Sequence, residues 1–153
     1  MTNEVNVQLF FRNLFLDFLD NTLKDSCWCF VSGDSTFAVP VCFVPENVQG
    51  YSNKEGIVIE ESFFANSSDN YIDFSETACT YHLMIMDDRG NGLRLKRFVN
   101  LIKEVFSVGV YDIDSSTGLE ILDVRSASFT SEENDTKVAI ILSIDGHVFD
   151  LTR

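Results

Sequence analysis

The residues of this chain best suited to chemistry are its four cysteines and two histidines. Cys27 and Cys29 are separated by one residue, so on a strand both thiols point to the same face. This spacing differs from the CxxC pairs of zinc sites and redox enzymes, and only His82 and His147 could add nitrogen ligands. The pattern therefore favours small apolar side chains in a core over a tetrahedral zinc site, and the same interpretation applies to Cys42 and Cys79.

Nucleophilic catalysis by a cysteine would need a neighbouring base. His82 lies between Tyr81 and Leu83 in an apolar strand, a position more typical of a core or interface histidine. Adjacent carboxylates such as Glu60 and Glu61 point to opposite faces of a strand, so they are poorly placed for joint acid–base work. We therefore predict a protein that is not an enzyme and that needs no cofactor and no metal.

Basic residues gather in one part of an otherwise acidic chain. The net charge is −13, which disfavours general attraction to nucleic acid or anionic lipid. Five of the eleven basic residues nevertheless fall within fifteen positions: Arg89, Arg94, Lys96, Arg97 and Lys103. This cluster suits an acidic partner, including a second copy of the chain, and a solvated helix face is the alternative interpretation.

The segment from Thr77 to Phe106 changes its apolar spacing from that of a strand to that of a helix. Tyr81, Leu83 and Ile85 alternate with residues that are themselves mostly apolar, which predicts a strand buried on both faces. Residues 87–92 supply a turn, in which Asp87 and Asp88 are available to cap the following helix. That helix carries apolar residues at steps of three and four, so we expect it to pack on the sheet.

A first helix is predicted from Glu4 to Lys24. Phe11 and Phe15 help to make its apolar stripe broader than one core face needs. Part of this stripe is therefore a candidate contact for a second subunit or a partner. The alternative is a helix sunk deeply into its own domain.

The remaining pattern predicts strands and polar connections. Pro40 suits an edge or a bulge better than a central strand. Strands outnumber helices, which predicts a single α+β domain over residues 1–153, with a mostly antiparallel sheet and both the N-terminal and the central helix packed on one face. The expected strands span residues 27–31, 36–44, 57–64, 80–86, 108–113, 119–129 and 136–144, and the long polar connections span 45–56 and 65–76.

The first residues of the chain and its lack of long apolar runs predict where the protein is located. The first residues lack a basic region and a cleavage site, so we expect no export and reduced cysteines. No run approaches the roughly 20 apolar residues of a membrane span, and we expect no membrane partner.

The order of these elements resembles that of phage tail terminator and neck (tail-to-head joining) proteins. The layout is a long helix, a hairpin, a further strand, the strand ending MIMDDRG, the helix LRLKRFVNLIKEVF and a closing pair of strands. The resemblance implies a hexameric, non-enzymatic ring that ends the tail tube and joins it to the head connector. It implies as partners further copies of the chain, the tail tube protein and a head-completion or connector protein, with DNA only passing through the lumen. The implied location is the virion tail or neck, and the host cytoplasm during assembly.

Such a ring repeats one contact between two different patches. The candidate patches are the basic helix face and the acidic connection that contains Asp69 and Asp73. Together with the aromatic stripe, the predicted interface residues are Arg89, Arg94, Lys96, Arg97, Lys103, Phe11, Phe15, Asp69 and Asp73. An acidic protein of this size could instead mimic DNA and inhibit a nucleic-acid-binding enzyme, although its acids are scattered through connections and not repeated along a helix.

Overall fold

The computed structural model describes residues 4–45, 55–67, 77–129 and 137–151. The expected hairpin, central strand, central helix and closing strands are all present, and the last strand runs six residues beyond its predicted end. The elements are α1 (Glu4–Thr22), β1 (Cys27–Ser32), β2 (Ser35–Val44), β3 (Ile57–Ser67), β4 (Thr77–Asp88), α2 (Gly92–Lys103), β5 (Gly109–Asp112), β6 (Thr117–Phe129) and β7 (Lys137–Asp150).

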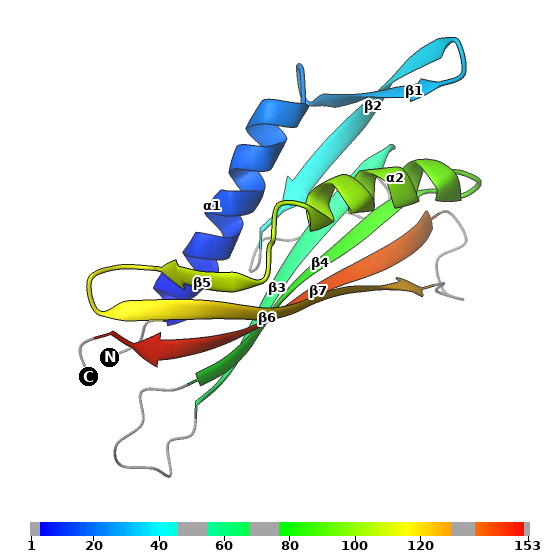
Figure 1. The fold of residues 1–153 in the computed structure, drawn as a ribbon. Coiled ribbons are helices and arrows are strands. Elements are labelled where there is room, and N and C mark those ends of the chain that lie inside the picture. The colour runs from blue at the N-terminus through cyan, green and yellow to red at the C-terminus, as the bar shows by residue number, and fades with distance from the viewer. Residues whose placement is uncertain (1–3, 46–54, 68–76, 130–136, 152–153) are drawn as a thin grey trace.

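All seven strands form one curled sheet, and the two helices lie on its concave side (Figure 1). The strand order is β1-β2-β3-β4-β7-β6-β5. β2 and β3 run parallel, and the other neighbouring pairs run antiparallel. The α+β class expected from the sequence is confirmed, whereas the parallel pair was not foreseen.

Pro40 marks the point where β2 changes partners. Residues of β2 up to Pro40 pair with β1, and those from Val41 onward pair with β3. Pro40 has no N–H to donate, so it suits a position with a strand on one side only. Gly56 lies against it with a φ of +86°, and a Cβ on Gly56 would come within 2.5 Å of the Pro40 carbonyl oxygen. This close approach requires glycine at the start of β3.

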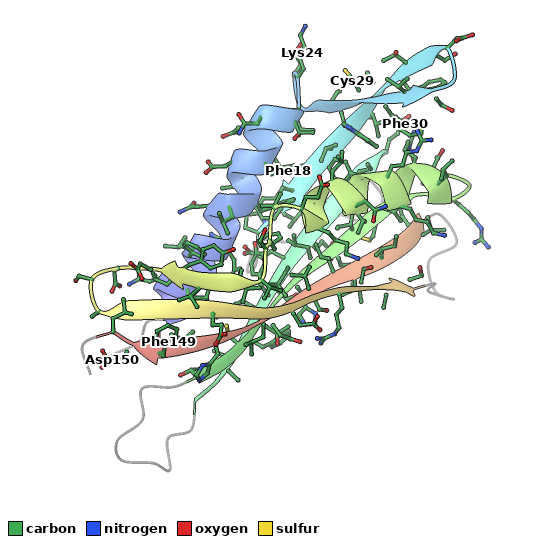
Figure 2. All side chains as sticks on the ribbon, viewed as in Figure 1. Phe18, Lys24, Cys29, Phe30, Phe149 and Asp150 are labelled. Carbon is green, nitrogen blue, oxygen red and sulfur yellow. The ribbon has the colours of Figure 1, made fainter. Side chains whose placement is uncertain are left out.

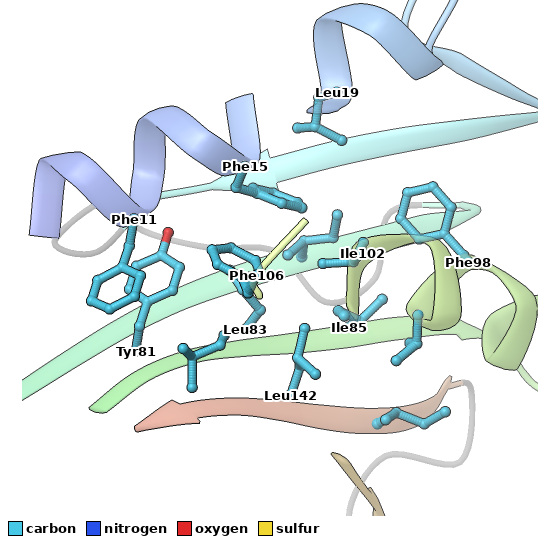
Figure 3. Close-up of a cluster of buried hydrophobic side chains, with 14 of the residues drawn as sticks. Phe11, Phe15, Leu19, Tyr81, Leu83, Ile85, Phe98, Ile102, Phe106 and Leu142 are labelled. Carbon is cyan, nitrogen blue, oxygen red and sulfur yellow. The ribbon is translucent and has the colours of Figure 1, made fainter. Parts of the chain in front are cut away.

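The main core lies between the two helices and the concave face of the sheet (Figure 3). Phe11 of α1 stacks on Tyr81 of β4, with 5.0 Å between ring centroids. Phe15 contacts Phe43 of β2, and Phe98 of α2 contacts Trp28 of β1. Phe11 and Phe15 are completely buried within the chain itself. The expectation that these two rings are open to a partner is therefore wrong, because the curl of the sheet encloses α1 more fully than a flat sheet would.

Strand β4 is apolar on both faces, as its sequence predicts. Tyr81, Leu83 and Ile85 belong to the main core. On the other face, Met86 joins a smaller buried cluster with Val44, Val58 and Ala139, against which Cys42 and Met84 pack. The central place of β4 between β3 and β7 explains why both of its faces need apolar side chains.

The turn after β4 differs from expectation. The N-cap of α2 is Asn91, and no side chain caps this end of the helix by a hydrogen bond. Asp87 and Asp88, predicted as caps, bind side chains of α2 and β7 instead. Gly90 makes the turn possible with a φ of +93°.

Candidate partner interface

The residues predicted as an interface do not form one uniform surface. Lys96 and Arg97 are exposed on α2, Arg89 is exposed just before it, and Lys103 is half-buried. Arg94 lies largely within the chain's own structure, and Phe11 and Phe15 lie in the core. Asp69 and Asp73 fall outside the described residues.

Arg94 is tied to the end of β4 by two charge-assisted hydrogen bonds. Its Nε donates to Asp87 Oδ2 at 2.8 Å and its Nη2 donates to Asp87 Oδ1 at 2.6 Å. The hydrogen bond to Asp87 raises the pKa of Arg94 against the opposing effect of burial. Because the Asp87 side chain is completely buried, this fork holds α2 against the sheet and is not available to a partner.

Asp88 makes the corresponding connection on the other face of β4. It accepts from Lys137 Nζ at 2.9 Å and from the Gly56 N–H at 3.0 Å. Lys137 Nζ also donates to the Gly56 carbonyl oxygen at 2.8 Å. Adjacent aspartates therefore clamp α2 on one face, and the ends of β3 and β7 on the other.

This second clamp predicts a dependence of stability on pH. Burial acts to raise the pKa of Asp88, but the hydrogen bonds from Lys137 and the Gly56 N–H outweigh it, and the pKa lies below its ordinary value of 3.8. The contribution is fully present above that value and is lost as the pH falls through the lower pKa of the folded state. We expect Lys137→Met to flatten the acid limb of a plot of unfolding free energy against pH. Urea unfolding at several pH values measures this dependence. If the unfolding free energies of the two proteins change equally with pH, the expectation is contradicted.

Arg97 binds the β1 hairpin. Its Nη1 donates to the Val31 carbonyl oxygen at 2.9 Å, and its guanidinium lies 5.3 Å from the centroid of the Phe30 ring. These contacts fix the outer part of the hairpin on the N-terminal half of α2. Arg97 therefore binds within the chain and is exposed at the same time.

Lys96 differs from the basic residues that ion pairs hold within the chain. Within the described part of the chain it makes no ion pair, whereas Arg12, Arg94, Arg125 and Lys137 all do. Lys96 lines a hollow of about 200 Å³ between α2 and the sheet. The other lining residues are Val99, Asn100, Ser126, Ser128 and Ile140.

An exposed stripe along α2, here called the outer face of α2, combines charge with apolar surface. Leu93 is 63% exposed and Leu101 is 36% exposed. They flank Lys96, Arg97 and Asn100, which are also exposed. Exposed leucines beside unpaired positive charge are a reasonable contact for an acidic protein surface.

A polar network below α1 was missed by the sequence analysis. Glu61 of β3 has a completely buried side chain. It accepts from Arg12 Nη2 at 2.6 Å, from Gln8 Nε2 at 3.2 Å and from the Tyr81 hydroxyl at 2.5 Å. The signal in the sequence was the single arginine on a helix otherwise rich in phenylalanine, together with an acidic residue at an inward strand position. The network ties α1 to β3 and β4.

The cysteines and histidines are spread over different surroundings. Cys29 is exposed and points out from the hairpin (Figure 2). Cys27 and Cys42 are half-buried, so the expectation of core positions holds fully only for Cys79. Burial raises the pKa of the Cys79 thiol to about 12, which makes it a poor nucleophile at neutral pH. Burial and then the charge of Arg125 lower the pKa of His82, against the opposite effect of Asp145.

Two kinds of feature are absent from the described residues, a metal site and a membrane-spanning helix. No three histidine, cysteine, aspartate or glutamate side chains come together there as a metal site. Neither helix in that part of the chain has the length and apolar character to cross a bilayer.

Comparison with known proteins gives a fold and no family. No protein-family model matches the chain, and no curated protein matches it. Ten chains of solved structures are similar. One of them, which carries no functional description, superposes with a TM-score of 0.54 over 90% of this chain and 94% of its own, at 13% sequence identity. At this identity the likeness shows that the chain shares a known fold over nearly its whole length.

Proposed function

We propose that this chain is a structural subunit of a tailed phage, forming a hexameric ring that ends the tail tube and joins it to the head connector. The observation that carries the proposal is the outer face of α2, where exposed leucines accompany Lys96 and Arg97 on a chain with a net charge of −13. A cyclic ring needs two different complementary patches on each subunit. A basic and apolar patch on an acidic protein meets that need for one side of the contact.

The other features of the fold are compatible with a scaffold. The Glu61 network holds α1 to the sheet, the Asp87–Arg94 pair holds α2 to it, and Asp88 joins β4 to Lys137 of β7 and to Gly56. These polar groups are occupied by bonds within the chain. Such a body suits a subunit that presents surfaces to neighbours.

The proposal is tested by measuring the mass of the purified chain, alone and with a tail tube protein from the same source, and by negative-stain microscopy. We expect hexameric rings, either free or on the ends of tubes. A chain that stays monomeric in both conditions and leaves tube length unchanged would overturn the proposal. Inhibition of a nucleic-acid-binding enzyme by that monomer would favour the DNA-mimic alternative.

Charge reversal on the outer face of α2 tests the contact itself. We expect Lys96→Glu to weaken ring formation by about tenfold or more, because a repulsion replaces an attraction at each interface of the ring. Lys24→Glu is a matched control with the same change of charge, at an exposed residue that points away from the body of the protein (Figure 2). Rings that form equally well from both variants would show that this face is not the contact.

A further inference from the structure

The outer edge of β6 is uncovered along more than half of its length. β5 pairs with β6 only from Gly118 to Ile121, whereas β6 continues to Phe129 beside β7. Residues 122–128, here called the open edge, therefore have backbone groups on their outer side that no strand of the described chain binds. A free edge of this kind is a template for pairing with another chain.

The opposite edge of the sheet is closed by local contacts. The Lys24 N–H donates to the Cys27 carbonyl oxygen at 2.8 Å, and the Cys27 N–H donates back to Lys24 at 3.0 Å. Further along β1, Arg97 occupies the carbonyl oxygen of Val31. β1 is also only six residues long. In the described residues the two outer edges therefore differ, because that of β1 is short and partly occupied, whereas that of β6 has the longer unpaired run, residues 122–128.

We propose that the open edge binds the open edge of a second copy of this chain, in an antiparallel arrangement with a two-fold axis at Val124. Asp123 and Arg125 flank this residue, and their side chains are 59% and 55% exposed. Reversal of a strand about Val124 sets Asp123 of each copy directly opposite Arg125 of the other. Opposite charges that face each other across strands stabilise the pair, and like charges destabilise it.

The same two charges select the register. A shift of the axis by one position to Asp123 sets two aspartates against each other, and a shift to Arg125 sets two arginines against each other. Only the axis at Val124 joins opposite charges on both sides, so neighbouring registers are disfavoured. Within each copy, Arg125 also forms an ion pair with Asp145, which keeps its side chain on this part of the sheet.

The residues around the open edge set the length of the contact and leave room for it. Regular pairing runs from Asp123 to Arg125 on each copy, because Leu122 is the extra residue of an irregularity in the pairing of β6 with β7, and beyond it the partner's edge is covered by its own β5. Leu122 is 53% exposed and lies at the margin of the contact, beside Ser126 of the other copy. Ser126 lines the hollow that also contains Lys96 and Asn100, so there is space beside the strand for side chains of the second copy.

This contact goes beyond the proposed ring and does not depend on it. A two-fold contact joins the same patch on both copies, whereas a ring repeats a contact between different patches. The open edge would therefore join two free chains, or two rings, and not neighbours within one ring. Masses that are dimeric and hexameric distinguish the two contacts directly.

The test is sedimentation analysis of the full chain and of two charge variants. We expect wild-type chains to dimerise with rising concentration, and Asp123→Arg and Arg125→Asp each to dimerise about tenfold more weakly, because like charges then meet at both ends of the contact. A mixture of the two variants should dimerise again, because every facing pair in the mixed dimer is opposite in charge. A wild-type chain that stays monomeric, or a mixture no stronger than its components, would overturn the proposal.

Disulfide trapping tests the register independently of charge. In a chain carrying Cys27→Ser, Cys29→Ser and Cys42→Ser, we expect Val124→Cys to form a covalent dimer on mild oxidation, since only the residue on the axis faces its own copy. Ser126→Cys is the matched control, because it would lie beside Leu122 of the other copy. Equal trapping of both variants, or trapping of Ser126→Cys alone, would contradict the axis at Val124. Circular dichroism establishes that each variant is folded.

Discussion

Phe11→Ala is expected to lower the free energy of unfolding by about 3–5 kcal/mol, the range observed when a buried phenylalanine is truncated. The ring of Phe11 is completely buried and stacks on Tyr81 with an interplanar angle of 9°. It also contacts Phe63 and Phe106, so its removal leaves a cavity bordered by β3, β4 and the connection that follows α2. For a chain of this size, a loss of this magnitude lowers the melting temperature by about 10 °C.

The measurement is urea unfolding followed by tryptophan fluorescence, with Leu9→Ala as a control on the same helix. Leu9 is 40% exposed, so its truncation should change stability by only a small fraction of the Phe11 effect. This comparison decides between the two sequence interpretations of the aromatic stripe. If Phe11 served a partner, its truncation would spare stability and weaken assembly. Equal losses for the two variants would contradict the assignment of Phe11 to the core.

Much of the fold follows from periodicity alone. Apolar residues alternate in β4 and β7 and recur at steps of three and four in α2, because these elements are buried against a single core. Burial of this kind can be read from the residue types. The parallel pairing of β2 with β3 is different, because it depends on which strand is the neighbour in space. Nothing local distinguishes Val41 beside Ile57 from other pairings of apolar strands.

The charged residues were harder to place for a related reason. Arg94 and Lys96 are two positions apart on one basic helix, yet Arg94 binds a buried aspartate and Lys96 makes no ion pair in the described chain. The two side chains leave the helix in different directions, and that of Arg94 is the one directed at the end of β4. Asp87 and Asp88 were expected to cap the nearest helix, whereas in the structure Asp87 binds Arg94 and Asp88 binds Lys137. Sequence spacing located the charge cluster but could not divide it into clamp and surface.

The Glu61 network shows the same limit most clearly, and it supports a second large prediction. Arg12→Met is expected to cost about 3–5 kcal/mol, because it removes the cation that compensates a completely buried carboxylate. Arg12 supplies Nε at 3.0 Å and Nη2 at 2.6 Å, so methionine would take away both the charge and the fork of donors. Gln8 and Tyr81 would still donate to Glu61, but neither carries a charge.

A double-mutant cycle with Glu61→Leu separates the ion pair from simple packing. If the penalty of Arg12→Met comes from a stranded charge, the double variant should recover most of the lost stability, since no buried carboxylate then remains. Additive losses would instead show that the two side chains contribute independently. A cost of Arg12→Met below about 1 kcal/mol would place the pair among ordinary surface ion pairs. In that case α1 would be held to the sheet mainly by its apolar side chains, and the polar network would serve only to set the direction in which the helix lies.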